Sequence, residues 1–189
     1  ADKAFVMVDL PFGSYEASDE QAVRSSTEIL HRSGAHCVKL EGGVRIAPRI
    51  KAIKDAGIPV CAHIGFTPQS VNNLGGFKVQ GRGAGSEQLI ADMQAVVEAG
   101  ADIVLMEMVP SDVAKRVTAE CPVPTIGIGA GADCDGQVLV WHDMVAFPED
   151  GHRPKFAKQW GNVGEVLTNA AAQYKKEVQD GTFPAAEHT

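Results

Sequence analysis

Polar residues that could do chemistry stand at the ends of short apolar runs along this sequence. Three are acids, one is a histidine, and one is a lysine two residues before an acid: Asp9, Lys39, Glu41, His63 and Glu107. Because the runs are rich in β-branched residues, we expect them to be buried strands. The chemistry therefore depends on whether the ends of these strands meet.

Asp9 and Glu41 together suit a hard divalent cation. Mg²⁺ takes oxygen ligands and keeps several waters, so two protein carboxylates suffice when a substrate supplies further ligands. Taken singly, each has a simpler interpretation: Asp9 precedes Leu10-Pro11 as a turn residue would, and Glu41 precedes Gly42-Gly43 as a solvated strand end would. If the two strand ends meet, the two acids together predict a magnesium site.

Lys39, His63 and Glu107 add a cation, a titratable ring and a base. Side chains alternate along a strand, so Lys39 and Glu41 share a face. A lysine in so apolar a strand needs an anion; we expect it to bind a substrate carboxylate, and an ion pair with Glu41 alone is the alternative. His63 is either a hydrogen-bonded structural residue or part of the site. Glu107 follows four apolar residues. Burial at such a strand end would raise the proton affinity of its carboxylate toward the working pH, which suits a general base.

Two glycine-rich segments lie beside these residues. Residues 65–85 lack helical or strand periodicity, and loops of that length are usually lids or binding loops. Lys78, Gln80 and Arg82 favour the binding loop. Residues 127–131, Gly-Ile-Gly-Ala-Gly, lack the last glycine and the βαβ context of a dinucleotide fingerprint. We interpret them as a turn that lets a ligand approach the backbone.

The elements that position these residues alternate between strand and helix. We expect strands over residues 5–9, 36–41, 58–63, 102–107, 123–127 and 137–141. We expect helices over residues 18–32, 45–56, 86–99 and 163–179, with a short helix capped by Ser111. Strict alternation with strands buried on both faces predicts a parallel sheet with right-handed crossovers.

The position of the polar residues decides between a doubly wound sheet and a barrel. They fall at the C-terminal ends of strands, with His142 and Asp143 as less clear members. In a barrel these ends ring one mouth, where the active site is built. We therefore expect a single domain over residues 1–189 with the α/β fold of a (β/α)₈ TIM barrel. Six strands indicate that the first two strand–helix units are absent, leaving the C-terminal three-quarters of the barrel.

Composition excludes several classes of protein. The net charge is −7 and the basic residues are scattered, so we expect no nucleic-acid partner. The apolar runs are too short to cross a membrane. The four cysteines, Cys37, Cys61, Cys121 and Cys134, show no metal-ligand or redox spacing. We expect buried free thiols at the two inside apolar runs, Cys37 and Cys61, and a cytoplasmic protein.

Seven stretches of the sequence resemble the ketopantoate hydroxymethyltransferase family. They are residues 9–12, 38–43, 63–70, 75–82, 106–110, 127–131 and 152–158. They occur in order along the whole chain, and several are specific to the family. The resemblance implies a (β/α)₈ barrel of the phosphoenolpyruvate/pyruvate-binding type. It also implies transfer of a hydroxymethyl group from 5,10-methylenetetrahydrofolate to 3-methyl-2-oxobutanoate, which gives 2-dehydropantoate in pantothenate biosynthesis.

The resemblance also assigns roles to residues by position. It implies that Asp9 and Glu41 ligate Mg²⁺, that Asp9 and Lys39 contact the oxo acid, and that His63 lies at the substrate pocket. It implies that Glu107 accepts the proton, so that a Mg-chelated enolate attacks the one-carbon unit on the folate. Members of the family assemble as large homo-oligomers, often decamers, so the resemblance implies the same here.

One family feature has no counterpart in this sequence. A Gly-Asp-Ser turn on an earlier strand supplies the family with a third Mg²⁺ ligand and a substrate-binding serine. The sequence thus resembles the family from its third barrel strand onward, and we expect either a fragment or upstream residues that were cleaved or lie on another chain.

Two alternative functions stay open at this point. One is a Mg-dependent carbon–carbon lyase or phosphonate mutase of the same barrel type. The other is a non-catalytic remnant that keeps a barrel-like body for oligomer contacts. The presence of Lys39, Glu41 and Glu107 argues against the remnant.

Overall fold

A computed structural model of the chain describes residues 3–147 and 154–189. The chain divides into two compact units, Ala1–Val138 and Leu139–Thr189. The expectation of one domain over residues 1–189 stays a prediction. His152 and Arg153, which begin the last family-like stretch, lie outside the described residues.

The first unit is built on a six-stranded sheet in which every pair of neighbours is parallel. Its strands are β1 (Met7–Asp9), β2 (Cys37–Glu41), β3 (Val60–Gly65), β4 (Ile103–Glu107), β5 (Thr125–Ile128) and β6 (Gly136–Gln137). They lie side by side in chain order. A doubly wound sheet reverses its order part-way, so this unit is a half-barrel and the expected parallel α/β arrangement is confirmed.

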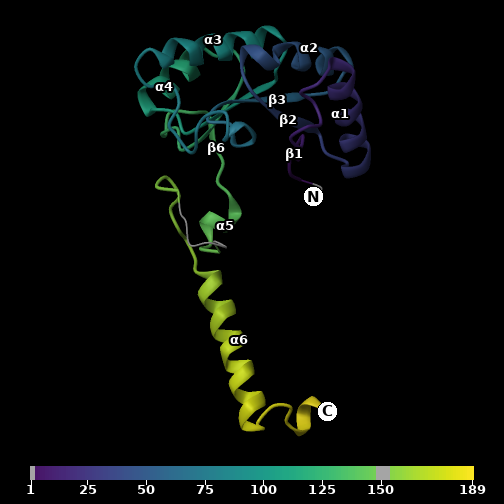
Figure 1. The fold of residues 1–189 in the computed structure, drawn as a ribbon, viewed down its shortest axis with the longest axis vertical. Helices are drawn as coiled ribbons and strands as arrows, with labels where there is room; N and C mark the ends of the chain where they lie inside the picture. Colours follow the sequence, from purple (N-terminus) through teal and green to yellow (C-terminus); the bar gives the residue numbers. More distant parts are fainter. Residues whose placement is uncertain (1–2, 148–153) are drawn as a thin grey trace. The chain divides into compact units, whose positions relative to one another are not determined.

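Helices connect the strands and lie outside the curved sheet (Figure 1). They are α1 (Asp19–Ser33), α2 (Ala47–Asp55), α3 (Gly85–Glu98) and α4 (Ser111–Glu120), with short 3₁₀ turns η1 (Val44–Ile46) and η2 (Pro68–Ser70). The Ser18 side chain accepts a hydrogen bond from the N–H of Gln21, and Gly34 ends α1 in the left-handed conformation, as the sequence predicts. The expected cap at Ser111 was wrong by one residue, because Pro110 holds the N-cap position of α4.

The hydrophobic core lies between the sheet and these helices. Every second strand residue points into it, and Leu40, Ala62 and Val104 are fully buried there. The expected buried thiols are confirmed for Cys37 and Cys61, and the four cysteines are free. The intervening strand residues face away from the helices, and they include Lys39, Glu41, His63 and Glu107.

The sixth strand differs from its prediction. It ends at Gln137, and the N–H of Val138 makes one more ladder bond to the carbonyl of Gly127. Trp141 begins the helix α5 (Trp141–Met144), so His142 and Asp143 lie in a helix and not at a strand end. The apolar, β-branched composition of residues 137–141 suggested a strand, but strand propensity depends on a pairing neighbour.

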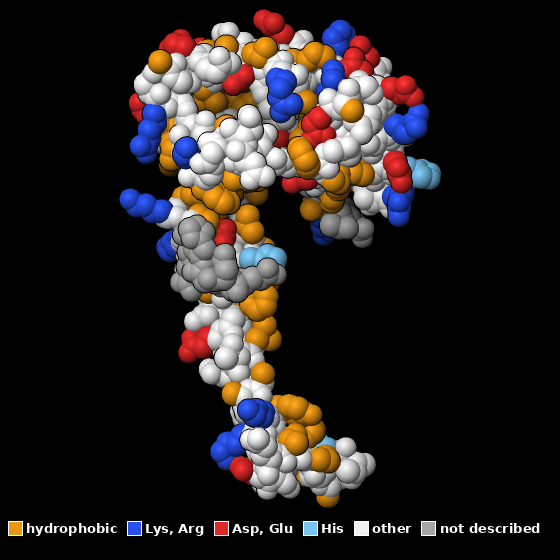
Figure 2. Space-filling model, viewed as in Figure 1, with side chains coloured by type: hydrophobic (Ala, Val, Ile, Leu, Met, Phe, Trp, Pro, Cys, Tyr) orange, Lys and Arg blue, Asp and Glu red, His pale blue; other side chains and the backbone are white. Residues whose placement is uncertain are grey.

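The second unit contains α5, α6 (Val163–Asp180) and the 3₁₀ turn η3 (Ala186–His188). The Asn162 side chain caps α6 by accepting a hydrogen bond from the N–H of Glu165. Apolar side chains are exposed along α6 (Figure 2), among them Val166, Leu167, Tyr174 and Val178. Across the described ranges, no helix has the length and apolar character to cross a bilayer.

Gly65, at the end of β3, provides a stability test of how closely β3 and β4 approach. Its φ is +86°, and a Cβ there would lie 2.6 Å from the carbonyl oxygen of Glu107 and 2.7 Å from Cγ2 of Val109. Gly57 has a similar φ of +82° but open space around it. Alanine at a left-handed position costs about 1–2 kcal/mol. We expect Gly65→Ala to lower the free energy of unfolding by a further 1–3 kcal/mol, roughly, relative to Gly57→Ala.

Urea denaturation followed by circular dichroism measures both variants. Equal losses for Gly65→Ala and Gly57→Ala would contradict the tight approach of the two strands.

Candidate functional site

The register of the sheet brings the predicted site residues to one face. It pairs Asp9 with Lys39, and Glu41 with His63. Paired residues of parallel strands point the same way, and so do residues two apart on one strand. Glu107 joins this face because it lies two residues beyond the partner of His63 on β4. The five side chains therefore share the face that the helices do not cover.

Contacts link these side chains into one cluster centred on His63. Nζ of Lys39 lies 3.2 Å from Oδ2 of Asp9 and 3.3 Å from Nδ1 of His63. The same Nδ1 lies 3.7 Å from Oε1 of Glu41, and Nε2 of His63 lies 3.3 Å from Oε2 of Glu107. The cation, the ring and the acids are thus within direct reach of one another.

The cluster is closed on one side and open on the other. The side chains of His63 and Glu41 are 3% and 5% exposed, and those of Lys39 and Glu107 are 12% and 16% exposed. The Asp9 side chain, on the edge strand β1, is 61% exposed. A small molecule can therefore approach past Asp9 toward a buried histidine and two largely buried acids.

Nε2 of His63 is an unsatisfied buried atom. Within the described part of the chain it makes no hydrogen bond, although Oε2 of Glu107 is 3.3 Å away. Buried polar atoms are almost always hydrogen-bonded, and exceptions need an explanation. A bound molecule between His63 and Glu107 would provide the missing partner.

Glu41 is a buried carboxylate with one oxygen held in place. Its Oε2 accepts a hydrogen bond of 2.8 Å from the backbone N–H of Gln69. Burial raises the pKa of Glu41, and the nearby His63, the Gln69 N–H and Lys39 oppose this only in part. A positive charge close to Oε1 would offset the remaining cost of burying this acid.

The donor chemistry of the two predicted ligands fits a hard cation. Asp9 and Glu41 offer carboxylate oxygens on adjacent strands and on the same face, which are the ligands that Mg²⁺ prefers. The described residues contain no cluster of three or more His, Cys, Asp or Glu side chains arranged to hold a metal. That Asp9 and Glu41 form part of a coordination shell stays a prediction.

The backbone around Glu107 is fixed from both sides. Its carbonyl accepts a hydrogen bond from the N–H of Phe66, and the next residue, Met108, has a left-handed φ of +48°. Met108 donates to Ile128 and accepts from the N–H of Gln80. Glu107 and the strained Met108 are together held by three neighbouring segments, which fixes the backbone at Glu107.

The prediction that residues 65–85 form a binding loop is not tested by the contacts of Lys78, Gln80 and Arg82. Gln80 ties the loop to the end of β4 through its backbone, whereas Lys78 and Arg82 are exposed. The structure records no contact of Lys78 or Arg82 with the cluster of Asp9, Lys39, Glu41, His63 and Glu107 within the residues it describes. That the loop binds a ligand remains a prediction.

Sequence reasoning missed Tyr15 and Gln69, which contact Glu41 directly. The hydroxyl of Tyr15 accepts a hydrogen bond from the Glu41 N–H and donates one to Oε1 of Gln69. Burial raises the pKa of Tyr15 to about 12, so the phenol is a neutral donor. The signal that could have found them was a tyrosine and a glutamine placed in aperiodic segments next to two strand ends.

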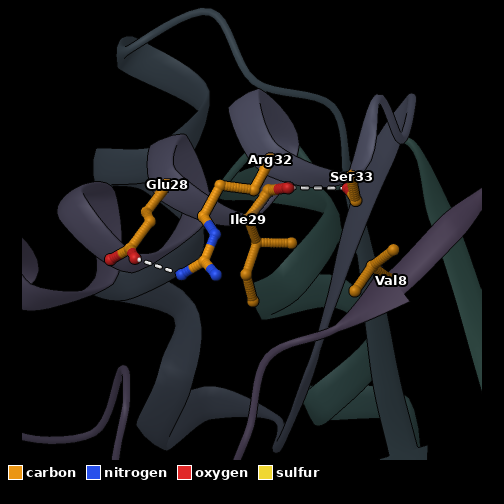
Figure 3. Close-up of a pocket in the computed structure, with 5 residues that line it drawn as sticks. All are labelled: Val8, Glu28, Ile29, Arg32 and Ser33. Atoms are coloured by element: carbon orange, nitrogen blue, oxygen red, sulfur yellow. Dashed lines mark hydrogen bonds and ion pairs between the residues drawn. The ribbon is translucent and has the colours of Figure 1, made fainter.

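A hollow of about 350 Å³ lies elsewhere, on the side of β1 that faces α1 (Figure 3). It is lined by Val8, Glu28, Ile29, Arg32 and Ser33. Its polar side chains are already paired: Arg32 with Glu28, and Ser33 with the carbonyl of Ile29. Because Val8 and Asp9 are adjacent on one strand, they point to opposite faces. The hollow is therefore separate from the His63 cluster.

The pKa of Glu41 predicts a dependence of stability on pH. Its folded-state pKa lies above the unfolded value, so the folded chain holds this proton more tightly, and the associated stability is lost as pH rises through the folded pKa. Each unit of difference corresponds to about 1.4 kcal/mol. Glu41→Gln removes this loss and can still accept the Gln69 N–H. We therefore expect the variant to be more stable than wild type near neutral pH, and the gap to close toward about pH 4.

Urea unfolding over this pH range in metal-free buffer measures the effect, with Glu20→Gln, on an 80% exposed side chain, as the control. Parallel pH profiles for wild type and Glu41→Gln would mean that burial does not penalise this carboxylate.

Comparison with solved structures supports the fold. A putative phosphonomutase from Burkholderia cenocepacia J2315 superposes with a TM-score of 0.51 over 92% of this chain and 72% of that protein, at 20% sequence identity. At that identity the likeness concerns the fold alone. It agrees with six parallel strands forming a half-barrel.

Known sequences match this chain over nearly its whole length. The family profile described as ketopantoate hydroxymethyltransferase matches residues 1–186. The 3-methyl-2-oxobutanoate hydroxymethyltransferases of Corynebacterium jeikeium and Corynebacterium diphtheriae are 73% and 62% identical to it. All of this chain is matched, and it spans 66% and 71% of the length of those two proteins. The five clustered residues therefore lie within the matched sequence, and the chain belongs to the ketopantoate hydroxymethyltransferase family.

Proposed function

We propose that this chain carries the oxo-acid-binding and proton-transfer site of a 3-methyl-2-oxobutanoate hydroxymethyltransferase. The reaction moves a hydroxymethyl group from 5,10-methylenetetrahydrofolate to 3-methyl-2-oxobutanoate and gives 2-dehydropantoate for pantothenate biosynthesis. Family membership supports the activity. The observation that carries the site assignment is the unsatisfied Nε2 of His63 beside Glu107, with Lys39 on the other side of the ring.

Lys39 and His63 are proposed to bind the oxo acid. The ammonium of Lys39 sits 3.2 Å from Asp9, and an incoming carboxylate can take the place of the Asp9 oxygen on it. Nε2 of His63 makes no hydrogen bond among the described residues and lies 3.3 Å from Oε2 of Glu107, so it is available to donate to a substrate oxygen. Mg²⁺, held by Asp9 and Glu41, would supply Lewis-acid stabilisation of the negative charge that develops on the substrate.

Glu107 is proposed to act as the general base. Its carboxylate takes the proton from C3 of the oxo acid, and the electron pair of the broken C–H bond remains on the carbon skeleton. C3 then bonds to the methylene carbon of the folate, water supplies the hydroxyl group, and the two C–N bonds of that carbon break to release tetrahydrofolate. The side chain is 16% exposed, so few waters compete for the proton. The hydrogen bond from Phe66 and the strained Met108 hold the base in one direction.

The proposal includes a larger assembly around these residues. In a closed barrel, two further strand–helix units would join β1 to β6, and a Gly-Asp-Ser turn on them would add a third Mg²⁺ ligand and a serine for the substrate. The open edges of the sheet at β1 and β6 support closure. We also propose a cytoplasmic homo-oligomer, since exposed apolar side chains along α6 offer contact surface.

Exchange of the C3 proton with solvent tests the role of Glu107 without the folate. The full-length protein should exchange this proton of 3-methyl-2-oxobutanoate for deuterium in D₂O. Because general bases contribute about 10²–10⁴-fold, Glu107→Gln should slow the exchange by about that factor while binding of the oxo acid changes little. Proton NMR of the substrate measures the rate.

Glu20→Gln, on an exposed side chain of α1, is the control and should exchange at the wild-type rate. If Glu107→Gln also exchanges at that rate, another group is the base, and His63 is then the first to be examined.

A further inference from the structure

Three segments that are far apart in the sequence meet behind the Glu41 carboxylate. They are the connection from β1 to α1 with Tyr15, the end of β2 with Glu41, and η2 with Gln69. Tyr15 is 1% exposed although it lies in a connection between elements. Burying a tyrosine hydroxyl in such a segment requires partners, and the partners here are Glu41 and Gln69.

The side-chain amide of Gln69 uses both of its ends. Oε1 accepts a hydrogen bond of 2.6 Å from the Tyr15 hydroxyl, and Nε2 donates one of 2.9 Å to the carbonyl of Leu10. Leu10 directly follows Asp9 and is fully buried. Only a group that is both donor and acceptor can make this pair of bonds, which a carboxylate or an aliphatic side chain cannot.

The backbone of the same residue reaches the second acid. The N–H of Gln69 donates to Oε2 of Glu41 at 2.8 Å, and the Tyr15 hydroxyl accepts the N–H of Glu41 at 3.2 Å. Gln69 is therefore joined to the residue after Asp9 by its side chain and to the Glu41 carboxylate by its main chain. A shift of the Gln69 side chain would also move the backbone N–H of Gln69, which is the donor that orients the Glu41 carboxylate.

A purely structural role would be to anchor the connection that follows β3. Such an anchor needs one bond to any fixed part of the sheet. The side chain of Gln69 instead bonds to Leu10, the residue after Asp9, and to Tyr15, its N–H bonds to Glu41 on β2, and no hydrogen bond recorded in the described residues ties its side chain elsewhere. The arrangement thus fixes the two acids relative to each other.

We propose that Gln69 is a positioning residue which, supported by Tyr15, sets the separation and orientation of Asp9 and Glu41 for a divalent cation. This inference rests on the proposed function, because it assumes that these two acids hold the metal. Outer-shell partners of metal ligands typically change metal affinity or activity by about 10–100-fold when they are replaced.

Two substitutions in the full-length protein test the proposal. Gln69→Asn keeps the amide but shortens it by one methylene, so that it cannot reach both Tyr15 and Leu10, and Tyr15→Phe removes only the hydroxyl. The matched controls are Gln94→Asn and Tyr174→Phe, both at exposed positions. Binding of Mn²⁺ alone is measured by electron paramagnetic resonance, and thermal unfolding is measured in parallel.

We expect the dissociation constant for Mn²⁺ to rise about tenfold or more in Gln69→Asn and to rise in Tyr15→Phe. The double variant should bind no more weakly than Gln69→Asn, because both substitutions break one network. The controls should bind as wild type does. In turnover, the concentration of Mg²⁺ needed for half-maximal rate should rise more than kcat at saturating Mg²⁺ falls.

Unchanged Mn²⁺ affinity in both variants, whatever happens to their melting temperatures, would reduce Gln69 to a loop anchor and leave the proposed function intact. A wild-type protein that binds no Mn²⁺ would overturn the metal site and this inference together. Tyr15→Phe is a mild change, so the test remains decisive even where Gln69→Asn does not fold.

Discussion

The alternation of side chains along parallel, in-register strands is the constraint on which the rest of this structure depends. On β2, Val38 and Leu40 point into the core beneath the helices, while Lys39 and Glu41 point to the opposite face. Neighbouring strands repeat this pattern in register, so a one-residue slip of β1, β2 or β4 would send a charged side chain toward the hydrophobic core. The burial of apolar residues on the helix side therefore fixes the positions of the polar residues on the other side.

Charge compensation on that face explains which side chains of the cluster are neighbours. Lys39 is flanked by Asp9 and His63, and His63 lies between Glu41 and Glu107. Each charged or titratable group thus has an opposite or hydrogen-bonding neighbour, which lowers the cost of removing it from water. The balance is incomplete at Nε2 of His63 and at the buried carboxylate of Glu41. Sites that bind and convert a substrate commonly retain such unsatisfied groups.

Much of this fold and part of the site could be predicted from the sequence, because both depend on local patterns. Apolar runs ending in a charged residue identified the strands, and Ser18 and Gly34 identified the ends of α1. The partner of Lys39 was not predictable in the same way. Glu41 is its neighbour in sequence, but the register places Asp9 opposite it. That register results from tertiary packing.

Sequence patterns could not predict the contacts of residues in aperiodic segments. Tyr15 and Gln69 are 54 positions apart, and nothing in their local sequence specifies that they meet. The assignment of residues 137–141 to a strand failed for a related reason, since the hydrogen bonds to β5 end with the N–H of Val138. Long-range hydrogen bonding decided both cases.

A crystal structure of the full-length protein with 3-methyl-2-oxobutanoate and Mg²⁺ would test the central claim most directly, which is that one face of the sheet binds and deprotonates the oxo acid. The account predicts the substrate carboxylate on Nζ of Lys39, and C3 within about 3–3.5 Å of the Glu107 carboxylate. An oxo acid bound out of reach of Lys39 and Glu107, for example in the hollow beside Val8 and Arg32, would contradict it.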